Sequence, residues 1–139
     1  MSSVRHQINI AASSRTVWNA LTTAEGVSSW WSDEARVDAR DGGRMVLVHL
    51  GGNEDGSDLH ERAVFHTVKP TRLIEIAFDT GNNGPTPGAR LKFQLGRDGD
   101  ETRVHVVHTC AAFDEDEALR AEVERGWKGA FKALQSALE

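Results

Sequence analysis

The chain has 139 residues and a formal net charge of −5, with 39% hydrophobic and 27% charged residues. This composition is typical of a globular protein, and a chain of this length can bury a core without disulfides or metal ions. The acidic balance argues against a nucleic-acid or anionic-membrane surface. No apolar stretch approaches the roughly 20 residues of a membrane-spanning helix, and the first residues do not form a secretory signal. With Cys110 as the single cysteine, these features predict a cytoplasmic protein.

The first elements along the chain are a strand and two short helices. Apolar and polar residues alternate over 4–10, which predicts a half-buried strand. Ser13 or Ser14 can cap the next helix, because a serine hydroxyl accepts a free backbone N–H. The helical spacing of apolar residues ends near Thr22, and a second short helical turn is expected before Trp30.

Six further strands are expected in the middle of the chain, where Gly- and Pro-containing turns separate short apolar runs. These strands cover residues 35–40, 44–50, 60–69, 72–79, 89–96 and 102–110. The connections between them are too short for parallel crossovers, so the pattern predicts an antiparallel meander.

A long helix over 115–138 is expected to end the chain. Its apolar residues step by three or four and form one stripe: Leu119, Val123, Trp127, Phe131, Leu134 and Leu138. Asp114 and Glu117 have the spacing of a capping box at its start. Gly126 and Gly129 lie inside the helix. Either another group approaches the helix backbone there, or both are tolerated surface glycines.

Together these elements predict an α+β domain. A curved antiparallel sheet of about seven strands surrounds the long C-terminal helix, and two short helices follow strand one.

This order resembles the helix-grip fold of the START-like, or SRPBCC, superfamily. Within it the sequence most resembles the polyketide-cyclase-like branch named after the C-terminal domain of the heat-shock-protein ATPase activator. The matching segments are residues 13–22, Trp30-Trp31, 41–44, 70–73, 102–108 and Gly126-Trp127, followed by Leu134 and Leu138. The resemblance implies a single domain over 1–139.

A ligand cavity is expected between the long helix and the concave face of the sheet. The residues expected to line it are Trp30, Trp31, Arg44, Met45, Leu47, Phe93, His108, Trp127 and Phe131. One ring of the Trp30-Trp31 pair can pack inward while the other lies at the cavity mouth; the alternative is that both are core aromatics.

His108 is the best candidate for an acid or base. It shares strand parity with Val104 and Val106 and therefore faces inward, and the resemblance also places a His at this position. We expect a ring that is neutral at pH 7, with one nitrogen bonded to protein and the other directed into the cavity. The alternative is a purely structural buried histidine.

No metal or cofactor is expected. His105 and His108 point to opposite faces of one strand, and His60 and His66 are too far apart on theirs to chelate an ion unaided. Cys110 has no basic neighbour in sequence to activate its thiol, so we expect it to be inert.

The first hypothesis for function is the binding of a small apolar or amphipathic molecule in the cavity. A cyclase, dehydratase or hydrolase that uses the same cavity is the second, and a co-chaperone-like interaction module, as a monomer or homodimer, is the third. A closed apolar cavity above about 300 Å³ beside Trp30, Trp31 and Trp127 would favour the first two. An exposed apolar or charged patch would favour the third.

Overall fold

Seven antiparallel strands form one sheet in the computed structural model, which describes residues 2–139. The strands are β1 (Ser3–Ile10), β2 (Glu34–Val37), β3 (Arg44–His49), β4 (Leu59–Lys69), β5 (Leu73–Phe78), β6 (Arg90–Asp98) and β7 (Glu101–Thr109). Their order across the sheet is β1-β7-β6-β5-β4-β3-β2, so only β1 leaves the order of the meander to pair with β7. The expected sheet is confirmed. β2 is shorter than predicted because the chain turns after it, where the Arg40 N–H donates to the Asp38 carbonyl.

Two short helices follow β1, as the sequence predicts. They are α1 (Ser14–Thr22) and α2 (Ala24–Ser28). Ser13 caps α1, since its hydroxyl accepts the Thr16 N–H at 3.1 Å. No helix described in residues 2–139 is long and apolar enough to cross a membrane.

The long helix α3 (Glu117–Leu138) begins later than the capping-box spacing predicts. Asp114 ends a short 3-10 helix, η1 (Ala111–Asp114), and its carboxylate accepts the Ser2 N–H and hydroxyl instead. Asp116 is the cap, because it accepts the Leu119 N–H at 2.9 Å. The predicted Asp114 cap is therefore wrong: the contact with Ser2, which precedes β1, holds its carboxylate away from the helix.

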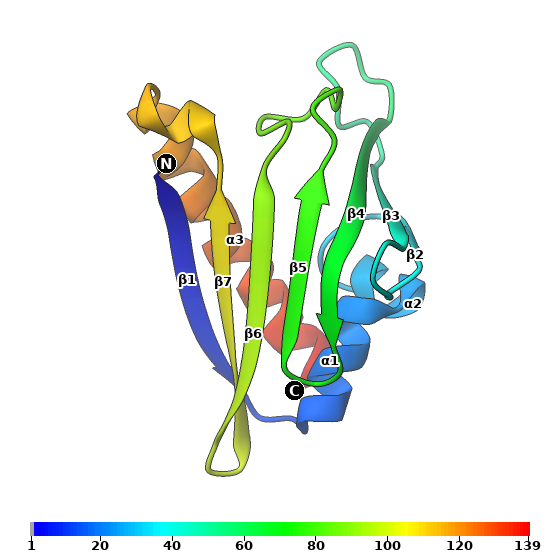
Figure 1. The fold of residues 1–139 in the computed structure, drawn as a ribbon, viewed down its shortest axis with the longest axis vertical. Helices are drawn as coiled ribbons and strands as arrows, with labels where there is room; N and C mark the ends of the chain where they lie inside the picture. Colours follow the sequence, from blue (N-terminus) through cyan, green and yellow to red (C-terminus); the bar gives the residue numbers. More distant parts are fainter. Residues whose placement is uncertain (1) are drawn as a thin grey trace.

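The inner face of the sheet is the face that α3 crosses (Figure 1). Alternation along β7 buries Thr102, Val104, Val106 and His108 on this face, and β3 buries Met45 and Leu47 in the same way. Phe131 and Leu134 of α3 pack into the same core and are fully buried. The core therefore lies between sheet and helix, and the ends of the strands beside α3 are where a cavity can form.

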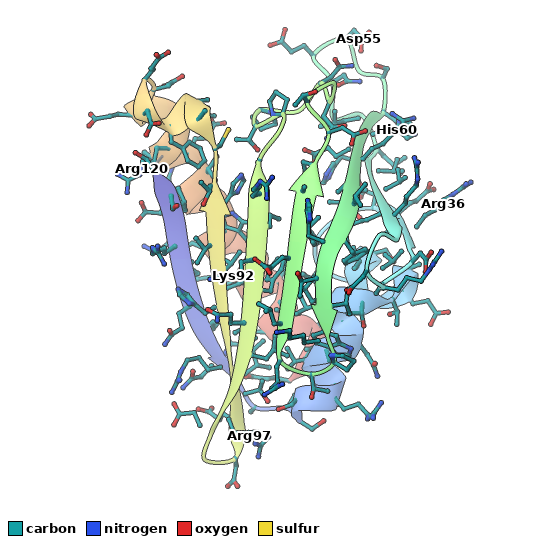
Figure 2. The ribbon with its side chains drawn as sticks, in the orientation of Figure 1. Arg36, Asp55, His60, Lys92, Arg97 and Arg120 are labelled. Carbon is teal, nitrogen blue, oxygen red and sulfur yellow. The ribbon has the colours of Figure 1, made fainter. Side chains whose placement is uncertain are left out.

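The outer face of the sheet is uncovered and carries mainly basic charge. In Figure 2 it lies toward the viewer, with Lys92 on β6 and Arg36 on β2 at its edge. Strand pairing places these Arg and Lys residues on it: Arg5, Arg36, Arg44, Arg62, Lys69, Arg90, Lys92 and Arg103. Strand pairing also places four acidic residues on this face: Glu34, Glu75, Asp98 and Glu101. The acidic net charge of the chain is thus unevenly distributed.

Candidate functional site

A cavity of about 390 Å³ lies between the N-terminal half of α3 and the adjoining ends of β3, β4 and β7. The lining residues are Trp31, His49, Glu61, Pro85, Thr86, His108, Leu119, Glu122, Val123, Gly126, Trp127 and Ala130. The volume is in the range of small-molecule sites. The cavity is open to solvent, so it meets the expected volume but is not the closed cavity that would favour a binder or an enzyme.

Two indole rings form the aromatic wall of this cavity. The rings of Trp31 and Trp127 lie with their centroids 5.8 Å apart, and Phe93 packs edge-on against both from the core side. Trp30 is buried and its Nε1–H donates to the Ala20 carbonyl at 2.8 Å. The Trp30 ring stacks on the half-buried ring of Trp31 and so supports Trp31 at the cavity wall.

His108 is bonded to protein through both ring nitrogens. The Trp127 Nε1–H donates to His108 Nδ1 at 2.9 Å, and Nε2 lies 3.2 Å from the Thr86 hydroxyl. An indole N–H can only donate, so Nδ1 is the acceptor and Nε2 of the neutral ring donates to Thr86. Burial lowers the His108 pKa from 6.5 to about 4, and the charge of Glu61 opposes this only in part. The second nitrogen was predicted to face open space, but the loop before β6 brings Thr86 to it.

His49 and Glu61 form a second polar pair on the cavity wall, and neither residue was among the predicted lining residues. The His49 Nε2–H donates to Glu61 Oε1 at 2.9 Å, and both side chains are partly buried. Gly84 makes room for the carboxylate, because a Cβ at Gly84 would lie only 2.5 Å from Glu61 Oε2. Strand parity could have found the pair, since His49 follows inward-facing Leu47 by two residues and Glu61 pairs with Leu47 across the strands.

The structure brings only part of the predicted lining set to the cavity. Trp31, His108 and Trp127 line it. Four of the others are fully buried core residues behind the cavity wall: Met45, Leu47, Phe93 and Phe131. Trp30 is also a buried core residue, and it borders a smaller hollow near α2.

Arg44 does not reach the cavity. It precedes inward-facing Met45 on β3, so alternation places it on the outer face, where it is exposed.

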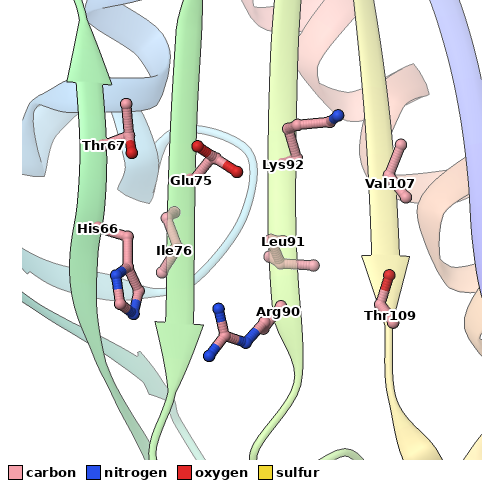
Figure 3. A pocket seen from close by; sticks show the side chains of 9 residues that line it. All are labelled: His66, Thr67, Glu75, Ile76, Arg90, Leu91, Lys92, Val107 and Thr109. Atoms are coloured by element: carbon pink, nitrogen blue, oxygen red, sulfur yellow. The ribbon is translucent and has the colours of Figure 1, made fainter. Parts of the chain in front are cut away.

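The other His, Cys, Asp and Glu residues that the structure describes do not form a metal site. Among residues 2–139, no three His, Cys, Asp or Glu side chains converge as metal ligands, and Cys110 is buried. The outer face has a hollow of about 360 Å³, in which Glu75 and Lys92 lie on neighbouring strands (Figure 3).

Comparison with known proteins identifies the family. The sequence profile described as "Activator of Hsp90 ATPase homolog 1-like protein" matches residues 11–139. The chain belongs to this family. No curated protein matches its sequence.

Several solved structures have the same fold as this member of the Activator of Hsp90 ATPase homolog 1-like family. The Aha1 dimer of Colwellia psychrerythraea is 22% identical with a TM-score of 0.83, over 100% of this chain and 97% of that chain. CalU16 of Micromonospora echinospora is 23% identical with a TM-score of 0.74, over 97% and 74%. DynU16, from the dynemicin biosynthetic locus, is 17% identical with a TM-score of 0.81, over 98% of this chain and 46% of that chain. The family match confirms the resemblance to the heat-shock-protein ATPase activator branch, and the solved structures confirm the helix-grip-like fold.

Proposed function

We propose that this protein binds a small, largely apolar molecule in the cavity between α3 and the inner face of the sheet. The observation that carries the proposal is an open space of about 390 Å³ with an indole wall and a few fixed polar groups. Binding sites for small molecules combine these features, because apolar walls supply affinity and a small number of polar groups fix orientation. His49, Glu61, Thr86 and His108 are those polar groups.

Filling the cavity from the helix side tests the proposal. Gly126 lines the cavity, and a Cβ added there meets no atom within 4 Å. Gly126→Leu therefore places a side chain in the open space, and it also removes a helix-interior glycine that costs up to about 1 kcal/mol. Gly129→Leu is the matched control, since a Cβ there also meets nothing within 4 Å but the residue does not line the cavity.

The readout is native mass spectrometry of each variant purified from the protein's own source. The wild type and Gly129→Leu should carry the same co-purifying molecule, and Gly126→Leu should not. Retention of that molecule by both variants would place the ligand elsewhere on the protein.

An acid–base enzyme that uses the same cavity is the second candidate. Two polar pairs, His49–Glu61 and His108–Thr86, face one space, so more than one proton-transfer group can reach a bound molecule. Chemical change of the co-purified molecule on incubation, slowed about 10²-fold or more by Glu61→Gln, would favour the enzyme over the binder.

A co-chaperone-like module remains the third candidate, favoured by the basic outer face rather than by apolar surface. Leu50 is the one exposed large hydrophobic side chain within residues 2–139. Stimulation of a purified Hsp90-type ATPase, lost in the double variant Arg62→Glu and Lys92→Glu, would support this role. We place the protein in the cytoplasm as a monomer or homodimer, and light scattering of the purified chain tests the oligomeric state.

A further inference from the structure

We propose that the cavity selects a ligand that joins a protonated amine to an apolar body. The inference rests on the proposed function and adds the chemical class of the ligand. It follows from the charges, the free acceptor and the aromatic rings that share this cavity.

The charged side chains on the wall are acidic. Glu61 and Glu122 line the cavity, and no Lys or Arg does so among the residues the structure describes. Glu61 is the inner carboxylate, with 17% of its side chain exposed, and Glu122 lies at the exposed rim of α3. Because no Lys or Arg neutralises them, these carboxylates attract a cation and repel an anion. Glu61 is partly buried, so solvent screens its charge less than it screens an exposed carboxylate.

The two histidines do not reverse this charge. His108 is neutral at pH 7 because burial lowers its pKa to about 4. His49 is turned toward Glu61, where its Nε2–H occupies Oε1. Glu61 Oε2 has no protein donor among the described residues, so it is free to accept a hydrogen bond from an ammonium group.

The indole wall completes the site for a cation. The Trp31 and Trp127 rings have electron-rich faces, and a cation within about 6 Å of an indole centroid is attracted to it. Both rings border the same space as Glu61, and their centroids are 5.8 Å apart. Leu119, Val123 and Ala130 of α3 offer an apolar surface for the remainder of the molecule.

Three probes with the same chain and different head groups test the selection: octylamine, octanol and octanoate. Calorimetric titration of the full protein at pH 7 should give affinities in the order ammonium, alcohol, carboxylate. The ammonium probe should bind about tenfold or more tightly than the alcohol, because a charged hydrogen bond and a cation–indole contact are added. At 1 M salt, where the Debye length is about 3 Å, this difference should shrink, while octanol binding should not weaken.

Two variants identify the groups responsible. Glu61→Gln keeps the shape and an acceptor for His49 but removes the charge, so it should weaken octylamine binding about tenfold and octanol binding by a smaller factor. Glu124→Gln is the control, because Glu124 is an exposed residue of α3 that does not line the cavity.

The outcomes separate this inference from the proposed function. Equal affinities for the three probes, or tighter binding of octanoate, would overturn the charge selection and leave the cavity as a binding site. Absence of saturable binding by all three probes would count against both. Octylamine binding that Glu61→Gln does not weaken would overturn the assignment of the amine to Glu61.

Discussion

At the scale of single residues, His108 shows what a sequence can and cannot reveal about this site. Alternation with Val104 and Val106 predicts its inward direction, and the structure buries it. Its partners, Trp127 and Thr86, come from a helix and a loop whose positions depend on packing across the whole domain. Strand parity therefore predicts the residue but not its hydrogen bonds, and the nitrogen predicted to be free is bonded to Thr86.

The lowered pKa of His108 predicts a loss of stability in acid. The folded-state pKa is about 4 and the unfolded value is 6.5, so the unfolded chain binds the proton first. The stabilisation is fully present above about pH 6.5 and is lost as the pH falls toward 4, by up to about 3 kcal/mol. Urea unfolding between these pH values measures it. His108→Gln keeps an acceptor for Trp127 without titrating, so its stability should fall less steeply; equal slopes would contradict the prediction.

A second residue-scale prediction concerns the space that Gly84 leaves for Glu61. Gly84→Ala puts a Cβ 2.5 Å from the present position of Oε2, so the flexible carboxylate must move and its bond to His49 must change. We expect a shift of the His49 ring resonances in NMR spectra and less than about 1 kcal/mol of lost stability, because the carboxylate can rotate away. Gly81→Ala is the control, since a Cβ there meets nothing within 4 Å. Unchanged His49 resonances in Gly84→Ala would show that the carboxylate is placed elsewhere in solution.

At the scale of elements, the sequence predicts most strands and helices because turn residues and apolar spacing act locally. The start of α3 is the exception. Asp114 and Asp116 are both good capping residues, and the choice between them depends on Ser2, at the opposite end of the chain. A local pattern cannot distinguish two adjacent caps when a long-range contact removes one of them.

Trp127 joins α3 to β7, and this predicts how substitutions there behave. Trp127→Phe keeps an aromatic ring but leaves His108 Nδ1 without its donor, so the free energy of unfolding should fall by about 1–3 kcal/mol. Trp127→Ala should cost about 3–5 kcal/mol through the lost ring. Trp18→Phe is the control, because Trp18 is a buried residue whose indole N–H makes no hydrogen bond to protein within residues 2–139. If Trp127→Phe costs no more than Trp18→Phe, the bond to His108 does not contribute to stability.

The turn between β4 and β5 contains a strained backbone conformation that a substitution can relieve. Thr71 has φ of 61° in the turn closed by the Arg72 N–H and the Lys69 carbonyl. This conformation is unfavourable for a β-branched residue and suits Gly or Asn. Thr71→Asn should therefore raise the free energy of unfolding by about 0.5–1 kcal/mol, measured by urea titration. A loss of stability would show that the Thr71 side chain makes a compensating contact.

At the scale of the whole molecule, net charge hides how the charges are arranged. The value of −5 by itself argues against a nucleic-acid or anionic-membrane surface, yet strand pairing gathers Arg and Lys on the outer face. The same parity that locates the core could have shown this, and it could also have located His49 and Glu61 on the inner face. Thr86 and Glu122 could not be found in that way, because a loop and a helix rim bring them to the cavity.

The uneven charge predicts opposite effects for two substitutions at one cross-strand pair. Glu75 lies directly opposite Lys92 on the outer face and borders the same hollow as Arg90 (Figure 3). Glu75→Lys places like charges opposite each other and should lower the free energy of unfolding by up to about 1 kcal/mol. The swapped double variant, Glu75→Lys with Lys92→Glu, should recover most of this loss. In 1 M salt the single variant should approach the wild type, because screening then acts over about 3 Å. A loss that salt does not reduce would mean that Glu75 stabilises the sheet by packing, and that repulsion among the basic residues of the outer face does not affect folding.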